Sequence, residues 1–202
     1  NNNKEWFDRN RERYTTVFKE PMDAFARDLN SMLIEKTGIN TISSVSRINR
    51  DIRFSKDKSP YRDHKWVVFK RNEGAWTNKP VLYFELGPDY YSLGMGIYEN
   101  MPKYMSAFRK KIDANTAEFE RLIKKYSGKS EFKLTGEMYK KKFADDKSPE
   151  VMNYYQRKSV GFICDRGIDE LVYRRELLDF CLEGFMYLMP FLNFMSSINM
   201  ED

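Results

Sequence analysis

The sequence predicts a single α+β domain over residues 1–202, in which helices pack against a mostly antiparallel sheet. Three observations support this fold class. Apolar side chains recur at three- and four-residue steps over residues 4–36 and again through most of the second half, which is the spacing of one helix face. Between them, several runs in residues 42–98 alternate with a period of two, as strands do. The 202 residues contain no repeat, linker or low-complexity tract, so one sizeable core is expected.

The helical segments have recognisable boundaries. In the first of them, Pro21 either kinks the helix or starts a second one, and Gly38 is a natural stop. Later helices are expected to begin at Pro102, at Asn115 with Glu118 three residues on, and at Ser148-Pro149. A long C-terminal helix from residue 168 is expected to be interrupted near Pro190, after a short strand over residues 159–164.

The middle of the chain carries the other predicted strands. Alternation over residues 48–54 predicts a strand with Ile48, Arg50, Ile52 and Phe54 on an apolar face and Arg47, Asn49, Asp51 and Arg53 on the other. A polar loop over residues 56–59 and a strand over residues 65–70 follow. The clearest element is a hairpin over residues 81–98 that turns at Gly87-Pro88-Asp89. Opposite its apolar side chains lie Glu85, Gly94 and Gly96, and bare glycines let a ligand or another backbone approach closely.

Composition excludes several classes of protein. Hydrophobic residues make up 41% and charged residues 32%, as in a folded globular chain rather than a disordered one. Two cysteines in apolar settings and one histidine form no standard zinc site, although a carboxylate-bound Mg²⁺ or Ca²⁺ stays open; no cofactor is predicted. The most apolar tract, residues 177–198, contains Asp179, Glu183 and Pro190, which argues against a membrane span. We see no signal peptide and expect a trimmed start and a cytoplasmic location.

Positive charge is concentrated in residues 47–65. This segment, which we call the basic segment, holds seven cations and three anions and so carries +4 of the chain's net +5. The rest of the chain has 28 cations and 27 anions, which is unlike the general positive coat of a non-specific duplex binder. Clustered guanidinium and ammonium groups hold phosphates and carboxylates, so the segment indicates a local anion site.

Each candidate residue has two interpretations, one functional and one structural. Arg50 on an apolar face needs a carboxylate such as Asp51, Asp57 or Glu85, either in a structural ion pair or beside a ligand. Asp51, flanked by two guanidiniums, should have a lowered pKa, as a carboxylate held ionised for binding or catalysis or as part of a solvated network. Lys56-Asp57-Lys58-Ser59 is either a phosphate-contacting loop or a solvated turn in which Asp57 caps its own backbone. His64 is either a general acid or base or a hydrogen-bonded structural residue.

Three hypotheses about function remain. The first is a binding module for a phosphate-bearing small molecule or single-stranded nucleic acid, with tyrosines as stacking surfaces. The second is an enzyme on an anionic substrate, with Asp51 or His64 in proton transfer. The third is a structural or interaction protein whose charges form an internal ion-pair lattice. The predicted ligand-binding residues are Arg47, Arg50, Arg53, Lys56, Lys58, Tyr61, Glu85, Gly94 and Gly96.

Several of these motifs also resemble a known family. Asn2-Asn3-Lys4-Glu5-Trp6-Phe7 looks like the N-N-x-x-W-F opening of a family of conserved proteins of bacteria and fungi, catalogued as a domain of unknown function. Residues 50–54 and 56–61 are similar to its R-D-x-R-F-x-K-D-K-S-P-Y signature, His64 to a histidine that often follows, and residues 94–98 to its glycine-rich strand. Many members have Asp-His-Pro where this chain has Asp146-Lys147-Ser148-Pro149. The resemblance implies a shared fold and a shared site, and it implies no reaction.

Overall fold

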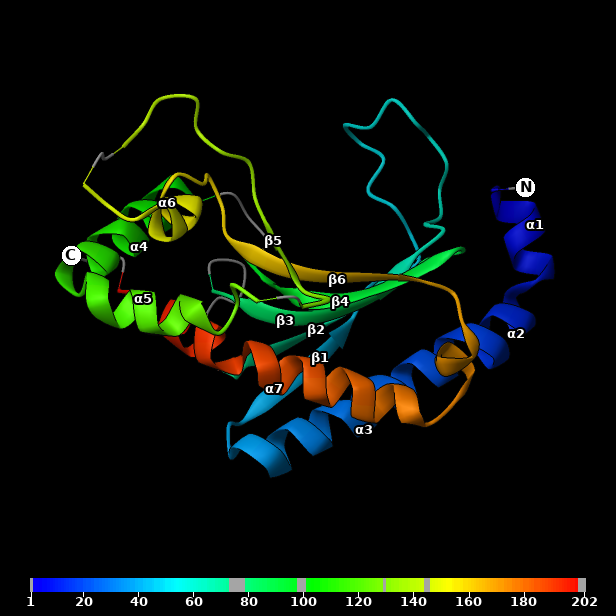
Figure 1. Ribbon diagram of the computed structural model, residues 1–202. Coiled ribbons are helices and arrows are strands. Elements are labelled where there is room, and N and C mark those ends of the chain that lie inside the picture. The colour runs from blue at the N-terminus through cyan, green and yellow to red at the C-terminus, as the bar shows by residue number, and fades with distance from the viewer. Residues whose placement is uncertain (1, 73–78, 98–100, 129, 144–145, 200–202) are drawn as a thin grey trace. The chain divides into compact units, whose positions relative to one another are not determined.

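The computed structural model describes residues 2–72, 79–97, 101–128, 130–143 and 146–199, and its fold is α+β, as predicted (Figure 1). One six-stranded sheet has the order β1-β2-β3-β4-β6-β5. The strands are β1 (Thr41–Val45), β2 (Lys65–Arg71), β3 (Val81–Leu86), β4 (Tyr90–Gly96), β5 (Lys133–Thr135) and β6 (Gly161–Gly167). The helices are α1 (Lys4–Arg9), α2 (Arg11–Tyr14), the π-helical turn η1 (Thr15–Lys19), α3 (Glu20–Thr37), α4 (Pro102–Ala114), α5 (Thr116–Lys124), α6 (Pro149–Tyr155), the 3-10 turn η3 (Glu170–Tyr173) and α7 (Glu176–Ser196).

The backbone divides into two compact units. The first unit comprises residues 1–72, 83–92 and 166–182, and the second comprises residues 73–82, 93–165 and 183–202. The prediction of a single domain over residues 1–202 stays a prediction. The residues of the predicted site fall mostly in the first unit.

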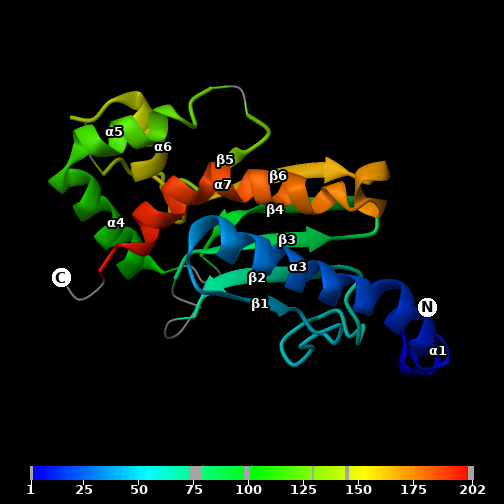
Figure 2. The same ribbon diagram turned by 90° about the horizontal axis from the view of Figure 1, so that it is seen from below.

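The N-terminal helices of the first unit follow the sequence closely. Pro21 lies in the first turn of α3, as expected for a second helix start, and Gly38 ends α3 with a positive φ of 68°. The buried stripe of α3 is Met22, Ala26, Leu29 and Leu33. α3 lies along the strands of the unit (Figure 2), and the Asn30 amide donates to the Thr41 carbonyl over 3.0 Å. β1 and β2 are antiparallel, from Thr41 opposite Arg71 to Val45 opposite Val67.

The predicted hairpin is confirmed as β3 and β4. The Gly87 amide donates to the Tyr90 carbonyl over 2.9 Å and closes the turn. The predicted strand over residues 48–54, by contrast, is wrong. Residues 46–64 form a long loop between β1 and β2 (cyan in Figure 1), and Phe54, placed by the alternation on an apolar face, is 94% exposed. The loop's side chains bond to one another and to its own backbone, so the segment folds on itself instead of extending a ladder.

The second unit confirms the predicted helix starts. Pro102 and Pro149 lie in the first turns of α4 and α6, and Asn115 exchanges hydrogen bonds with Glu118 in a capping box at the start of α5. The strand predicted over 159–164 is β6, at Gly161–Gly167, and it pairs antiparallel with β5, which the sequence analysis missed. Aromatic rings fill much of this core, among them Phe108, Phe119, Phe162 and Phe191.

The predicted interruption near Pro190 is also wrong. α7 continues from Glu176 to Ser196 with Pro190 inside it. Pro190 is exposed, while its neighbours Met189 and Phe191 are buried, so packing on both sides of the proline holds the helix together despite the missing backbone donor. By length and composition α7 could cross a membrane, but half of its most apolar window is buried inside the structure, as in a core helix. Cys164 and Cys181, which the sequence places in apolar settings, are buried.

A buried guanidinium in the second unit was not anticipated. Arg109 on α4 is 8% exposed and donates to the carbonyl oxygens of Met105, Tyr155 and Arg157 over 3.0, 2.8 and 2.7 Å. Its guanidinium also lies 4.2 Å from the centre of the Phe143 ring. The charge is therefore satisfied by backbone carbonyls, and it links α4 to the end of α6.

Candidate functional site

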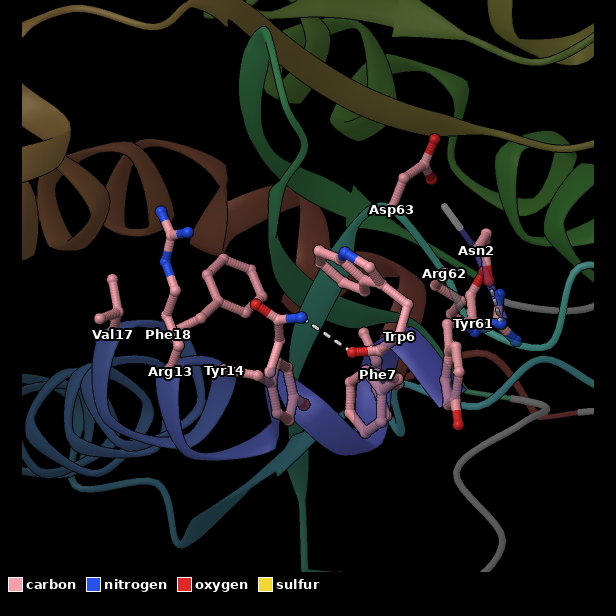
Figure 3. Close-up of a pocket in the computed structure, with 12 residues that line it drawn as sticks. Asn2, Trp6, Phe7, Arg13, Tyr14, Val17, Phe18, Tyr61, Arg62 and Asp63 are labelled. Atoms are coloured by element: carbon pink, nitrogen blue, oxygen red, sulfur yellow. Dashed lines mark hydrogen bonds between the residues drawn. The ribbon is translucent and has the colours of Figure 1, made fainter. Parts of the chain in front are cut away.

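The first unit contains a groove of about 430 Å³ between its N-terminal helices and the base of the 46–64 loop (Figure 3). We call it the aromatic groove, because its walls carry the rings of Trp6, Phe7, Tyr14, Phe18 and Tyr61. Its polar lining includes Arg13, Arg62 and Asp63. Flat apolar walls with a few charged groups are typical of a small-molecule site.

Two segments that are far apart in the sequence close this groove. The Asn2 side-chain amide donates to the Tyr61 carbonyl over 2.8 Å, and its oxygen accepts from the Tyr61 amide over 3.1 Å. The rings of Phe7 and Tyr61 stack with centroids 4.1 Å apart, and Asn3 caps α1 by accepting from the Trp6 amide over 2.9 Å. The opening Asn-Asn-x-x-Trp-Phe element and the Ser-Pro-Tyr end of the loop signature therefore form two walls of one site.

The cations near the groove have different surroundings. Arg62 lies with its guanidinium 4.6 Å from the centre of the Trp66 ring. Arg13 is exposed and has no ion pair among the described residues. Lys65 is 3% exposed, and its ammonium donates to the Tyr14 hydroxyl over 3.1 Å, directly behind one wall. A buried ammonium adds positive potential to the groove without closing it.

His64 does not line the groove, but its hydrogen-bond partner Asp63 does. His64 Nδ1 lies 2.7 Å from Asp63 Oδ1, and this hydrogen bond holds the pKa of Asp63 below its usual value. The imidazole also lies near Trp66, with ring centroids 5.8 Å apart. The proposed proton-transfer role of His64 stays a prediction.

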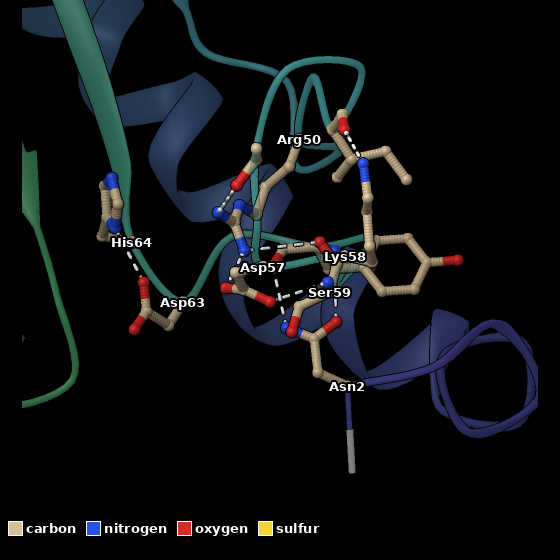
Figure 4. Close-up of polar contacts among 10 residues, drawn as sticks. Asn2, Arg50, Asp57, Lys58, Ser59, Asp63 and His64 are labelled. Carbon is tan, nitrogen blue, oxygen red and sulfur yellow. Dashed lines mark hydrogen bonds and ion pairs between the residues drawn. The ribbon is translucent and has the colours of Figure 1, made fainter.

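Arg50 is the centre of a polar network inside the loop (Figure 4). Its guanidinium pairs with Asp57, one of the three carboxylates that the sequence suggests as partners, and lies 3.4 Å from the Ser55 hydroxyl. The apolar strand face predicted for Arg50 would have buried it, but its side chain keeps a quarter of its surface exposed. Hydrogen bonds from Ser59, and then from Arg50, hold the pKa of Asp57 well below its usual range.

Arg53 and Asp51 form a second pair in the same loop. Arg53 donates through Nε and Nη2 to the two carboxylate oxygens over 2.9 and 2.7 Å, and through its amide over 3.2 Å. These bonds, followed by the charge of Arg47, lower the pKa of Asp51 to about 2, in the expected direction. Lys58 donates to the Ile52 carbonyl over 2.9 Å, whereas Arg47 and Lys56 are exposed with no ion pair among the described residues. Arg50, Arg53 and Lys58 thus shape the loop.

The other predicted site residues lie in the sheet. Glu85 on β3 accepts a hydrogen bond from the Tyr90 hydroxyl. Gly94 and Gly96 lie on β4 in the second unit, and a Cβ built at Gly96 would come 3.9 Å from the Gly161 Cα. The neighbour that comes close there is the backbone of β6. A site shared by these residues and the loop stays a prediction.

Lys147 lies in the segment where many members of the resembled family have Asp-His-Pro, and its surroundings are well defined. The side chain of Lys147 is 9% exposed, and its ammonium lies 2.6 Å from the Asp113 carboxylate, which also accepts from the Tyr155 hydroxyl over 2.9 Å. The pair raises the pKa of Lys147, and burial, followed by the bond to Asp113, raises that of Tyr155 to about 12. A lysine here joins the segment before α6 to α4. Across the described ranges, no group of three His, Cys, Asp or Glu side chains is placed to hold a metal ion.

The residues that the sequence analysis missed are Trp6, Phe7, Arg13, Tyr14 and Arg62. The available signal was the Trp-Phe opening, which was recognised but not connected to the basic segment. Comparison with curated proteins finds no match. A family model described as "Conserved hypothetical protein (DUF2461)" matches residues 1–194, which include both walls of the groove, and the chain therefore belongs to this family.

Proposed function

We propose that the protein is a binding module for a phosphate-bearing ligand with a planar aromatic group, that is, a nucleotide unit, held in the aromatic groove. The observation that carries the proposal is the meeting of the Asn2–Phe7 element and Tyr61 around a groove rimmed by Arg13 and Arg62. Stacking on aromatic side chains suits any nucleobase, since every base has a π-face.

The charges of the groove support an anionic ligand. Arg13 is exposed without an ion pair among the described residues, and Lys65 places a buried ammonium behind Tyr14. Arg47 and Lys56 add exposed positive charge on the loop beside it. A phosphate would compete with few internal carboxylates here, Asp63 being the acid among the lining residues.

The chemistry of Asp51 favours binding over proton transfer. A carboxylate with a pKa of about 2, bonded through both oxygens to Arg53, is a weak general base near neutral pH. The ion pairs of Arg50 and Arg53 with Asp57 and Asp51 agree with the hypothesis of an internal ion-pair lattice for these two arginines. We therefore propose that they stabilise the conformation of the loop and do not bind the ligand. Half of the most apolar window of α7 is buried inside the structure, as in a core helix, and we propose a cytoplasmic location.

The test is a thermal-shift and fluorescence titration of the purified protein with AMP, ADP and inorganic phosphate. A ligand that binds only the folded state raises the melting temperature. Bases stacking on Trp6 should also quench its fluorescence, and a Trp6→Phe variant should lose that quenching while still binding.

Arg13→Gln should weaken nucleotide binding about tenfold, because one charge-assisted contact is lost. Arg27→Gln is the matched control, since Arg27 is an exposed arginine of the same unit outside the groove. Equal losses in both variants, or no nucleotide response in the wild type, would overturn the proposal.

A further inference from the structure

We infer that the ligand is single-stranded nucleic acid rather than a free nucleotide, with Phe54 as a second stacking platform; this inference rests on the proposed function. Phe54 lies in the loop whose other end supplies Tyr61 to the aromatic groove, and its ring is 94% exposed. A single exposed aromatic ring would need no explanation. The arrangement around Phe54 is what carries the inference.

The loop that bears Phe54 is held in shape by its own bonds. Arg50 pairs with Asp57, Arg53 pairs with Asp51, and Lys58 donates to the Ile52 carbonyl over 2.9 Å. The Arg53 guanidinium also lies 5.8 Å from the centre of the Phe54 ring. An ordered loop presents the ring at little entropic cost on binding, and the guanidinium beside the ring helps to hold it in place.

The distance between the two stacking platforms, Tyr61 in the groove and Phe54 on the loop, fits a short single-stranded oligonucleotide. Phe54 and Tyr61 are seven positions apart in the sequence, so their Cα atoms are at most about 25 Å apart by the reach of an extended chain. Single-strand sites on proteins typically cover about 4 to 16 nucleotides, which is enough to extend from the groove to Phe54. A mononucleotide in the groove would leave Phe54 unused.

The charges on the loop also fit a phosphate backbone. Arg47 and Lys56 are exposed on it and form no ion pair among the described residues. A negatively charged membrane surface would also be attracted to these cations, and a phenyl ring can enter its interface. A membrane would not need the aromatic groove, whereas single-stranded nucleic acid would use both the groove and Phe54. We therefore favour nucleic acid, and membrane binding is one outcome of the test.

The test measures the affinity of labelled single-stranded oligonucleotides by fluorescence anisotropy, from a mononucleotide up to about 8 nucleotides. Affinity should rise with length until both platforms are occupied, and it should fall steeply between about 50 mM and 200 mM salt. Phe54→Leu should weaken oligonucleotide binding about tenfold and leave mononucleotide binding unchanged, because it removes the stacking ring and keeps an apolar side chain. Phe54→Trp should retain the affinity. Tyr173→Leu, at an aromatic residue 81% exposed outside the loop and the groove, is the control.

Each other outcome has a definite meaning. If a mononucleotide binds and longer strands bind no tighter, the inference fails and the proposed function stands. If neither binds, both fail. Equal affinity for a duplex of the same length, or Phe54→Leu binding like the wild type, would overturn the role of stacking. Binding to vesicles of anionic lipid that depends on Phe54, without oligonucleotide binding, would assign the loop to a membrane surface instead.

Discussion

The pairing of Asn2 with Tyr61 makes a measurable prediction about how the groove is closed. Asn2 both donates to and accepts from the backbone of Tyr61, over 2.8 and 3.1 Å, in the way that a neighbouring strand would. Asn2→Ala removes both hydrogen bonds and leaves the rest of the N-terminal segment in place. We expect the variant to fold and to open more often at this point.

The size of the effect follows from the exposure of these bonds. An exposed intramolecular hydrogen bond contributes at the low end of the usual range, about 0.5 kcal/mol, so the two together contribute about 1 kcal/mol. That is about a fivefold increase in the population of the open form. The stacking of Phe7 on Tyr61, with centroids 4.1 Å apart, remains and limits the opening, since such a pair is worth about 0.5–1.5 kcal/mol.

Native-state hydrogen exchange of the Tyr61 amide is the direct assay, because this amide has Asn2 as its acceptor. Its exchange should become about fivefold faster in Asn2→Ala. The amides of Arg50 and Arg62 are internal controls, as they donate to Pro60 and Ile48 within the loop over 2.9 and 2.8 Å. Unchanged exchange at Tyr61 would refute the reasoning, and an equal rise at all three amides would mean that the loop unfolds as a whole.

Three further predictions concern the loop and the second unit. In an NMR titration, the Asp51 carboxylate should have a pKa near 2 in the wild type, and in Arg53→Gln its pKa should rise toward the ordinary value of 3.8. The stability that the Asp51–Arg53 pair contributes to the wild type is therefore fully present above about pH 3.8 and is lost as the pH falls toward 2. Arg109→Met should lower the free energy of unfolding in urea by about 3 kcal/mol, because three carbonyls lose a charged donor, and a loss below about 1 kcal/mol would contradict the buried assignment. Gly161→Ala should lower the melting temperature, since its Cβ would lie 2.7 Å from a carbonyl oxygen of β4, whereas Gly128→Ala, with nothing within 4 Å, should not; equal effects would argue against that close packing.

The elements predicted correctly are those whose signals are local. The capping box at Asn115, the turn at Gly87 and the left-handed Gly38 each depend on a few neighbouring residues, and each lies where the sequence placed it. β5 was missed because three residues are too short to show a period. The interruption expected at Pro190 failed for the opposite reason, since buried neighbours on both sides override the local preference.

The site could be predicted only in part, because it depends on contacts across long stretches of chain. The bond from Asn2 to Tyr61 spans 59 residues, and no periodicity or spacing indicates it. The alternation over residues 48–54 was misleading for a related reason. Arg50 and Arg53 form ion pairs with Asp57 and Asp51 within the loop, so the alternating charges stabilise the loop and do not mark one face of a strand. A charged signature of this kind therefore determines the conformation of the loop first. Around the groove and the loop, the described arginines and lysines whose side chains form neither an ion pair nor a hydrogen bond are Arg13, Arg47, Lys56 and Arg62, and three of these four lie in the basic segment that the sequence identified.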